Sequence, residues 1–103
     1  MFKLKSTVGL AGMQPELVPA MIVAAELLAE LGHDCVVTSV TDSQHVGASL
    51  HYVGYAMDLR TKHMPAEQHE AVRAELAERM GPQYDVVLET DHIHIEYQPK
   101  SNL

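Results

Sequence analysis

In the stretch Asp91-His92-Ile93-His94-Ile95-Glu96, near the end of the chain, polar and apolar residues alternate from His92 onward. Alternation with a period of two is typical of a β-strand that has one face on the hydrophobic core and the other face open. Ile93 and Ile95 are therefore expected to face the core, and His92, His94 and Glu96 to face away from it. The apolar face requires a covering layer, for which helices are the expected element.

A second alternating segment covers residues 55–60. Its apolar positions Tyr55, Met57 and Leu59 share one face, and the opposite face carries Ala56, Asp58 and Arg60. If this strand lies beside the strand at residues 91–96, Asp58 and His94 meet on the open face of one sheet.

Apolar residues at helical spacing predict two helices. The first has its apolar face at Leu17, Met21, Ala24, Leu28 and Leu31. The second begins near Pro65, ends at Gly81-Pro82 and has its apolar stripe at Val72, Leu76 and Met80. Glu75 and Arg79 stand one helical turn apart and are expected to pair. Short apolar runs at residues 35–40 and 84–88 are expected strands, with a loop at 41–50. The sequence thus predicts an α+β fold, in which helices pack on one face of a small antiparallel sheet.

The composition limits the possible partners. The 103 residues are enough for one domain, 1–103, of which residues 98–103 are expected to form a flexible tail. The net charge of −7 and the absence of a basic stripe argue against nucleic acid as a partner. No apolar segment suits a signal peptide or a membrane span, so no membrane partner is expected. The single cysteine, Cys35, is expected to be a core residue.

Two segments about forty residues apart, 49–58 and 91–96, carry the metal-competent side chains. Together they supply two histidines and a carboxylate at spacings that suit one zinc ion with an open coordination position. Three protein ligands plus one water is the arrangement of catalytic zinc. The residues therefore predict a metallohydrolase, with its zinc site on the open face of the sheet.

The pattern Ser49-x-His51-x-x-Gly54-x-Ala56-x-Asp58, followed by His92-x-His94, resembles the signature of the zinc D-Ala-D-Ala carboxypeptidases and their relatives, including L-alanyl-D-glutamate endolysins and the hedgehog amino-terminal domain. The resemblance covers roughly residues 17–97. The short chain and the acid that precedes the last two histidines are most similar to phage-encoded members.

That family binds zinc through the first histidine, the aspartate and the last histidine, which implies His51, Asp58 and His94 as the ligands. Two neutral imidazoles and one carboxylate leave the zinc with a net positive charge. Such a zinc ion lowers the pKa of a bound water and polarises the scissile carbonyl.

A peptidase also needs a carboxylate that takes a proton from the attacking water. Asp91, three residues before His94 as in several endolysins, is preferred, and Glu89, near the hedgehog spacing, is the alternative. In a regular strand, Asp91 and Glu89 would both face the side opposite to His94. Either acid can therefore act as the base only if the chain bends at the start of the strand. His92 is a further catalytic candidate, as an oxyanion donor.

Three residues are candidates for substrate binding. His45 is a second possible oxyanion donor, and Ser49 and Arg60 are candidates to hold a substrate carboxylate or to orient Asp58. Many relatives carry an arginine in the loop after the first strand, where this chain has Thr41-Asp42-Ser43. The usual clamp for a substrate carboxylate is therefore missing at that place, which favours an endopeptidase or a weak carboxypeptidase.

The resemblance implies a zinc peptidase that acts on murein peptides containing D-amino acids, located in the host cytoplasm or in a virion. The alternative is a non-catalytic zinc domain used in assembly, for example as a virion or tail component, because the hedgehog domain keeps this site without an established peptidase role.

Overall fold

The computed structural model describes residues 1–5, 15–41 and 56–98 of the chain. In chain order the elements are β1 (Phe2–Leu4), α1 (Leu17–Glu30), β2 (Cys35–Thr41), β3 (Ala56–Arg60), the short 3-10 helix η2 (Ala66–Gln68), α2 (His69–Met80), β4 (Tyr84–Leu88) and β5 (His92–Tyr97). The five strands form one sheet in the order β1-β2-β3-β5-β4. All neighbouring strands are antiparallel except β1 and β2, which are parallel. The predicted α+β class is confirmed.

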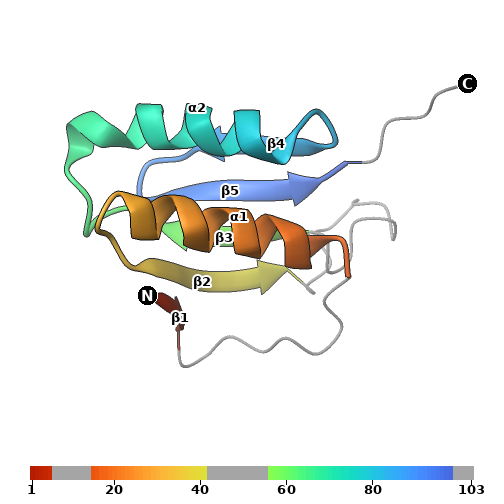
Figure 1. Cartoon of the computed structure of the whole chain (residues 1–103), viewed down its shortest axis with the longest axis horizontal. Helices are drawn as coiled ribbons and strands as arrows, with labels where there is room; N and C mark the ends of the chain where they lie inside the picture. Colours follow the sequence, from red (N-terminus) through yellow and green to blue (C-terminus); the bar gives the residue numbers. More distant parts are fainter. Residues whose placement is uncertain (6–14, 42–55, 99–103) are drawn as a thin grey trace, which may run out of the picture.

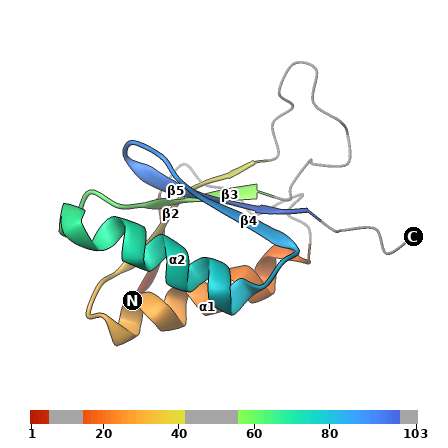
Figure 2. The same ribbon diagram turned by 90° about the horizontal axis from the view of Figure 1, so that it is seen from above.

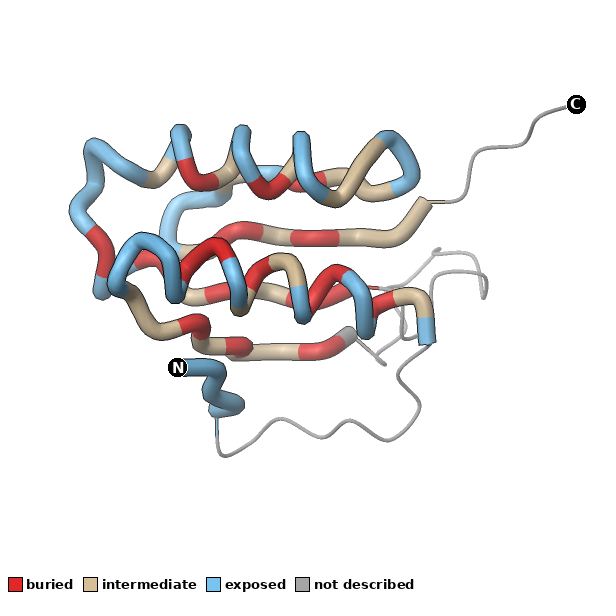
Figure 3. The backbone as a smooth tube through the Cα atoms, in the orientation of Figure 1, coloured by how far each residue is buried: buried red, intermediate tan, exposed pale blue. Residues whose placement is uncertain are grey.

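The two helices cover one face of the sheet, and the opposite face carries no described helix (Figures 1 and 2). Buried residues of both helices and of β2, β3, β4 and β5 form a single core between the layers, and Figure 3 shows where they lie along the backbone. Met57 and Leu59 of β3 and Ile93 and Ile95 of β5 are at most 2% exposed. Their alternating partners are partly exposed on the open face, with the exception of Ala56, which is buried. The helices thus leave the polar side of the two central strands free.

The register of the central strands places Asp58 directly opposite His94 and Arg60 opposite His92. The expected meeting of Asp58 and His94 on neighbouring strands is therefore present. On the other side of β3, an irregularity in β2 between Val37 and Ser39 shifts the pairing so that Ser39 stands opposite Asp58. A bulge of this kind re-aims side chains on the bulged strand. It gives Ser39 access to the same face as Asp58.

The C-terminal end and the surface ion pair of α2 agree with the sequence prediction, whereas α2 begins at His69, after the 3-10 helix η2 that follows Pro65. Gly81 ends the helix with a φ of 91°, a left-handed conformation that glycine adopts without steric cost. Arg79 Nε lies 2.9 Å from Glu75, and its other guanidinium nitrogens bind Glu30 of α1 at 2.9 Å. The arginine thus links the two helices.

Strand β1 was not predicted. Its three residues are exposed, with Phe2 and Leu4 each 39% exposed, and it pairs along one edge only. Such a short edge strand has no alternating pattern, because neither of its faces is deeply buried. At the other end of the chain, Gln98, the first residue of the expected tail, donates its backbone N–H to Gln83 O at 2.6 Å. Residues 99–103 lie outside the described part.

Cys35 is 1% exposed in β2, as predicted for a core cysteine. Burial raises the pKa of its thiol from the usual 9.0 to about 11, and the positive chain terminus offsets this only in part. At pH 8 the folded protein should therefore carry about a hundredfold less thiolate than an exposed cysteine, in addition to steric protection. We expect slow reaction with a thiol reagent such as DTNB in native buffer and rapid, complete reaction in denaturant. Equal rates in the two solutions would contradict the burial of Cys35.

Candidate functional site

The centre of the open face is a pair formed by Asp58 of β3 and His94 of β5. Asp58 Oδ1 lies 2.9 Å from His94 Nδ1, and the two side chains are about one quarter exposed, at 24% and 28%. Because their neighbours in sequence are core residues, the backbone of both strands is held in place from the opposite face. The pair therefore stands on a rigid part of the fold, as a precise site requires.

Each member of the pair has an outer partner that fixes its orientation. Ser39 Oγ donates to Asp58 Oδ2 at 2.9 Å, across the β2–β3 pairing. His94 Nε2 lies 3.2 Å from Glu96 Oε1, two residues further along the same face of β5. Hydrogen bonds of this kind orient the side chains that ligate metals.

The pair is strongly polarised. Burial alone would raise the pKa of Asp58, but hydrogen bonds from His94 and Ser39, together with the charges of His92 and His94, outweigh burial and lower it. The hydrogen bond to Asp58 raises the pKa of His94 to about 9, with a smaller contribution from Glu96 and against the effect of burial. A positive charge on the His94 ring, which lies between Asp58 and Glu96, is thus favoured.

His92 and Asp91 extend the site toward the β4–β5 turn. His92 Nδ1 lies 2.7 Å from Asp91 Oδ1, and its Nε2 lies 3.6 Å from Asp58 Oδ1. The hydrogen bond from His92 lowers the pKa of the Asp91 carboxyl, assisted by the charges of His92 and Lys62. Asp91 precedes β5 in a bend, so its side chain reaches the open face despite its strand parity.

Glu89 is placed differently. It is exposed in the same turn, and its backbone N–H donates to His92 O at 2.8 Å. Its side chain does not line the cavity beside Asp58, whereas that of Asp91 does. Between the two acids proposed as the base, the geometry therefore favours Asp91.

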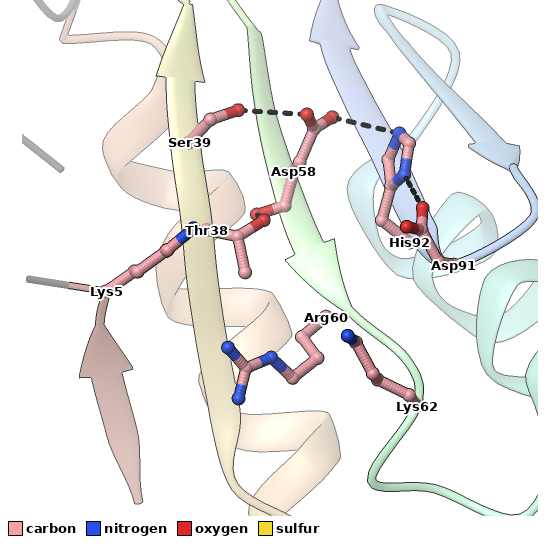
Figure 4. A pocket seen from close by; sticks show the side chains of 8 residues that line it. All are labelled: Lys5, Thr38, Ser39, Asp58, Arg60, Lys62, Asp91 and His92. Carbon is pink, nitrogen blue, oxygen red and sulfur yellow. Dashed lines mark hydrogen bonds and ion pairs between the residues drawn. The ribbon is translucent and has the colours of Figure 1, made fainter. Parts of the chain in front are cut away.

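A cavity of about 260 Å³ lies beside the Asp58 carboxylate (Figure 4). It is open to solvent on the face of the sheet opposite the helices, and its lining is mostly polar. The lining residues are Lys5, Thr38, Ser39, Asp58, Arg60, Lys62, Asp91 and His92. In Figure 4, Ser39, Asp58, His92 and Asp91 form a row linked by hydrogen bonds and one ion pair, and the basic side chains lie to one side of that row.

Asp58 and His94 fit the role of zinc ligands. Zinc bonds of about 2.0–2.2 Å place tetrahedral ligand atoms roughly 3.3 Å apart. The observed 2.9 Å between Asp58 Oδ1 and His94 Nδ1 needs little adjustment to reach that separation. A zinc ion would replace a proton of His94, since a histidine ligand must have a free nitrogen.

The third implied ligand, His51, lies outside the described residues, as do His45 and Ser49. Within residues 1–5, 15–41 and 56–98, no group of three histidine, cysteine or acidic side chains is arranged to hold a metal ion. The third ligand of the implied zinc site, His51, would therefore be added to Asp58 and His94 from outside the described residues.

The structure adds several residues to the site that the sequence did not predict. Ser39 and Glu96 orient the central pair, and Lys5 and Lys62 line the cavity. Glu96 could have been found, because it follows His94 at the strand period. Ser39, Lys5 and Lys62 depend on strand pairing and turn geometry, which single-sequence patterns do not provide.

Comparisons of the chain with models of known protein families, with curated proteins and with solved structures found no match. Among the described residues, no helix has the length and apolar character required to span a bilayer.

Proposed function

We propose that the protein is a zinc-dependent peptidase that hydrolyses murein peptides containing D-amino acids. The observation that carries this proposal is the Asp58–His94 pair, which lies on the open face next to a cavity that also receives the Asp91 carboxylate. A ligand pair, a nearby acid and a space for substrate are three of the requirements for metal-assisted hydrolysis. The murein substrate comes from the resemblance of residues 49–58 and 91–94 to the carboxypeptidase family.

Asp58 and His94, with His51, would hold the zinc, and Ser39 keeps the Asp58 carboxylate in position. When bound, zinc would supply a Lewis acid for the scissile carbonyl and for the attacking water. Asp91, with its lowered pKa, is ionised at neutral pH and can therefore accept a proton from that water and pass it to the leaving amine. His92, oriented by Asp91, presents its Nε2 toward the centre of the site, and with its ring protonated at both nitrogens it can donate to the oxyanion.

The proposal predicts about one zinc per chain and cleavage of short peptides that contain alanine and a D-residue. Purified protein would be analysed for metal and then incubated with a panel of murein peptides, with and without a chelator. We expect cleavage that the chelator abolishes and that added zinc restores. Zinc-replete protein that leaves the whole panel intact while remaining in a larger assembly would instead support the non-catalytic assembly domain.

A further inference from the structure

The lysines and arginines in the described part of the chain divide into two groups. The chain has seven lysines and arginines and a net charge of −7. Outside the cavity, Lys3 pairs with Asp34 at 2.9 Å, Arg73 with Glu70 at 2.7 Å, and Arg79 with Glu30 and Glu75 at 2.9 Å. The remaining described cations are Lys5, Arg60 and Lys62, and all three line the cavity beside Asp58.

These three cations form no ion pair with any acid in the described part of the chain. Lys62 is close enough to Asp91 to help lower the pKa of that carboxyl, but the two side chains form no ion pair. Each of the other described lysines and arginines of this acidic chain forms an ion pair with at least one carboxylate. Three free cations around one cavity are therefore a local excess of positive charge, and such an excess attracts anionic ligands.

The three side chains come from separate parts of the fold. Lys5 follows β1 at the sheet edge, Arg60 is the last residue of β3, and Lys62 stands two positions beyond it. Lys5 is held in place by its backbone N–H, which donates to Val37 O at 2.9 Å. Figure 4 shows Arg60 and Lys62 below the row formed by Asp58, His92 and Asp91. The side chain of Lys5 runs toward Thr38 in the same view. The cavity thus has a cationic side next to the proposed catalytic side.

The charge balance of the lining favours a carboxylate over a phosphate. Three cations and the two acids Asp58 and Asp91 leave one net positive charge when His92 is neutral. A carboxylate carries a single charge, which matches this excess. A phosphate dianion would bring a second charge toward Asp58 and Asp91, and like charges at short range repel. The planar guanidinium of Arg60 can also bind a carboxylate through two parallel hydrogen bonds.

We propose that Lys5, Arg60 and Lys62 form a binding site for one carboxylate of a peptide, close to the bond that is cleaved. The identity of the peptide rests on the proposed function, whereas carboxylate binding itself needs no metal. The site would replace the arginine that many relatives carry where this chain has Thr41-Asp42-Ser43. A free terminal carboxylate would then have a partner, so carboxypeptidase action becomes compatible with this chain.

The test is a binding measurement on zinc-free protein in the presence of chelator, so that no hydrolysis occurs. Isotope-labelled protein would be titrated with N-acetyl-alanyl-D-alanine, which has one carboxylate, and with its C-terminal amide, which has none. We expect the acid to bind about tenfold more tightly, with shifts at residues near the cavity, and the preference to weaken at high salt. Arg60→Gln should remove most of the preference for the acid over the amide. The double variant Lys5→Gln and Lys62→Gln, at two exposed positions, should reduce this preference by about three- to tenfold.

Lys3→Gln is the matched control, because Lys3 lies on the same strand as Phe2 and Leu4 but is paired with Asp34 outside the cavity. It should leave the preference unchanged. Equal binding of acid and amide, or an equal loss in Lys3→Gln and in the Lys5 and Lys62 variants, would overturn the proposal. Displacement of the peptide by inorganic phosphate at a lower concentration than by acetate would also overturn it, in favour of a phosphate site. Because chelator is present throughout, these outcomes are independent of whether the protein binds zinc or cleaves peptides.

Discussion

Replacing His94 or Asp58 with alanine is expected to remove nearly all bound zinc and all peptidase activity. Each variant deletes one of three implied ligands from the Asp58–His94 centre, where the two side chains meet at 2.9 Å. The loss of an outer-shell partner already costs roughly 10- to 100-fold in metal affinity, so the loss of a ligand should cost more than about a hundredfold. Metal content after dialysis and competition with a chromogenic chelator would measure the effect. His51→Ala, in the part of the chain outside the described residues, should behave in the same way.

The fold should survive these substitutions. The core is built from the opposite face of the same strands, by Met57, Leu59, Ile93 and Ile95, and none of these side chains is altered. Circular dichroism and thermal unfolding should therefore resemble those of the parent protein.

Two variants serve as controls for the ligand substitutions. Asp85→Asn removes a carboxylate from β4 outside the cavity, and His33→Ala removes a histidine that contacts Gln68. Both should keep their zinc. Full zinc retention in all three ligand variants would show that the metal, if any, is bound elsewhere.

The parts of this fold that the sequence predicted are those in which one face of an element is deeply buried. In β3 and β5 the core takes every second residue, so the period of two is visible in the chain and places Asp58 and His94 on the same face. Their adjacency followed from the assumption that the strands are neighbours, and the register Asp58↔His94 bears it out. The second helix could be predicted from the sequence equally well, because Val72 and Leu76 are the buried positions of an otherwise polar segment.

The parts that were missed depend on pairing between distant segments. Ser39 reaches Asp58 because β2 is irregular after Val37, and no local pattern in residues 35–41 indicates where that shift occurs. Lys5 reaches the cavity because the exposed strand β1 adds to the sheet edge in parallel. The preference for Asp91 over Glu89 came only from the spacing in related endolysins, because strand parity required a bend for either acid. In the structure the choice depends on the bend before His92, which turns only Asp91 toward the cavity.

Asp91→Asn is expected to retain zinc yet lose hydrolysis by about a hundredfold or more, the usual effect of removing a general base. The asparagine keeps the size of the side chain and can still accept a hydrogen bond from His92, but it cannot take a proton from water. Because the Asp91 side chain is 70% exposed, the substitution should not disturb the fold. The measurement is kcat on a cleaved murein peptide with zinc-saturated enzyme, alongside the metal content of the same sample.

Glu89→Gln is the matched comparison, since it removes an acid from the same turn, two residues away, that does not line the cavity. We expect it to change kcat by less than about threefold, because only an acid within reach of the attacking water can serve as the base. A hundredfold loss in Glu89→Gln with a nearly unchanged Asp91→Asn would reverse the assignment of the two acids. A large loss in Asp91→Asn that is accompanied by loss of zinc would show instead that Asp91 supports the metal site, through His92 and its approach to Asp58 at 3.6 Å, rather than the proton transfer.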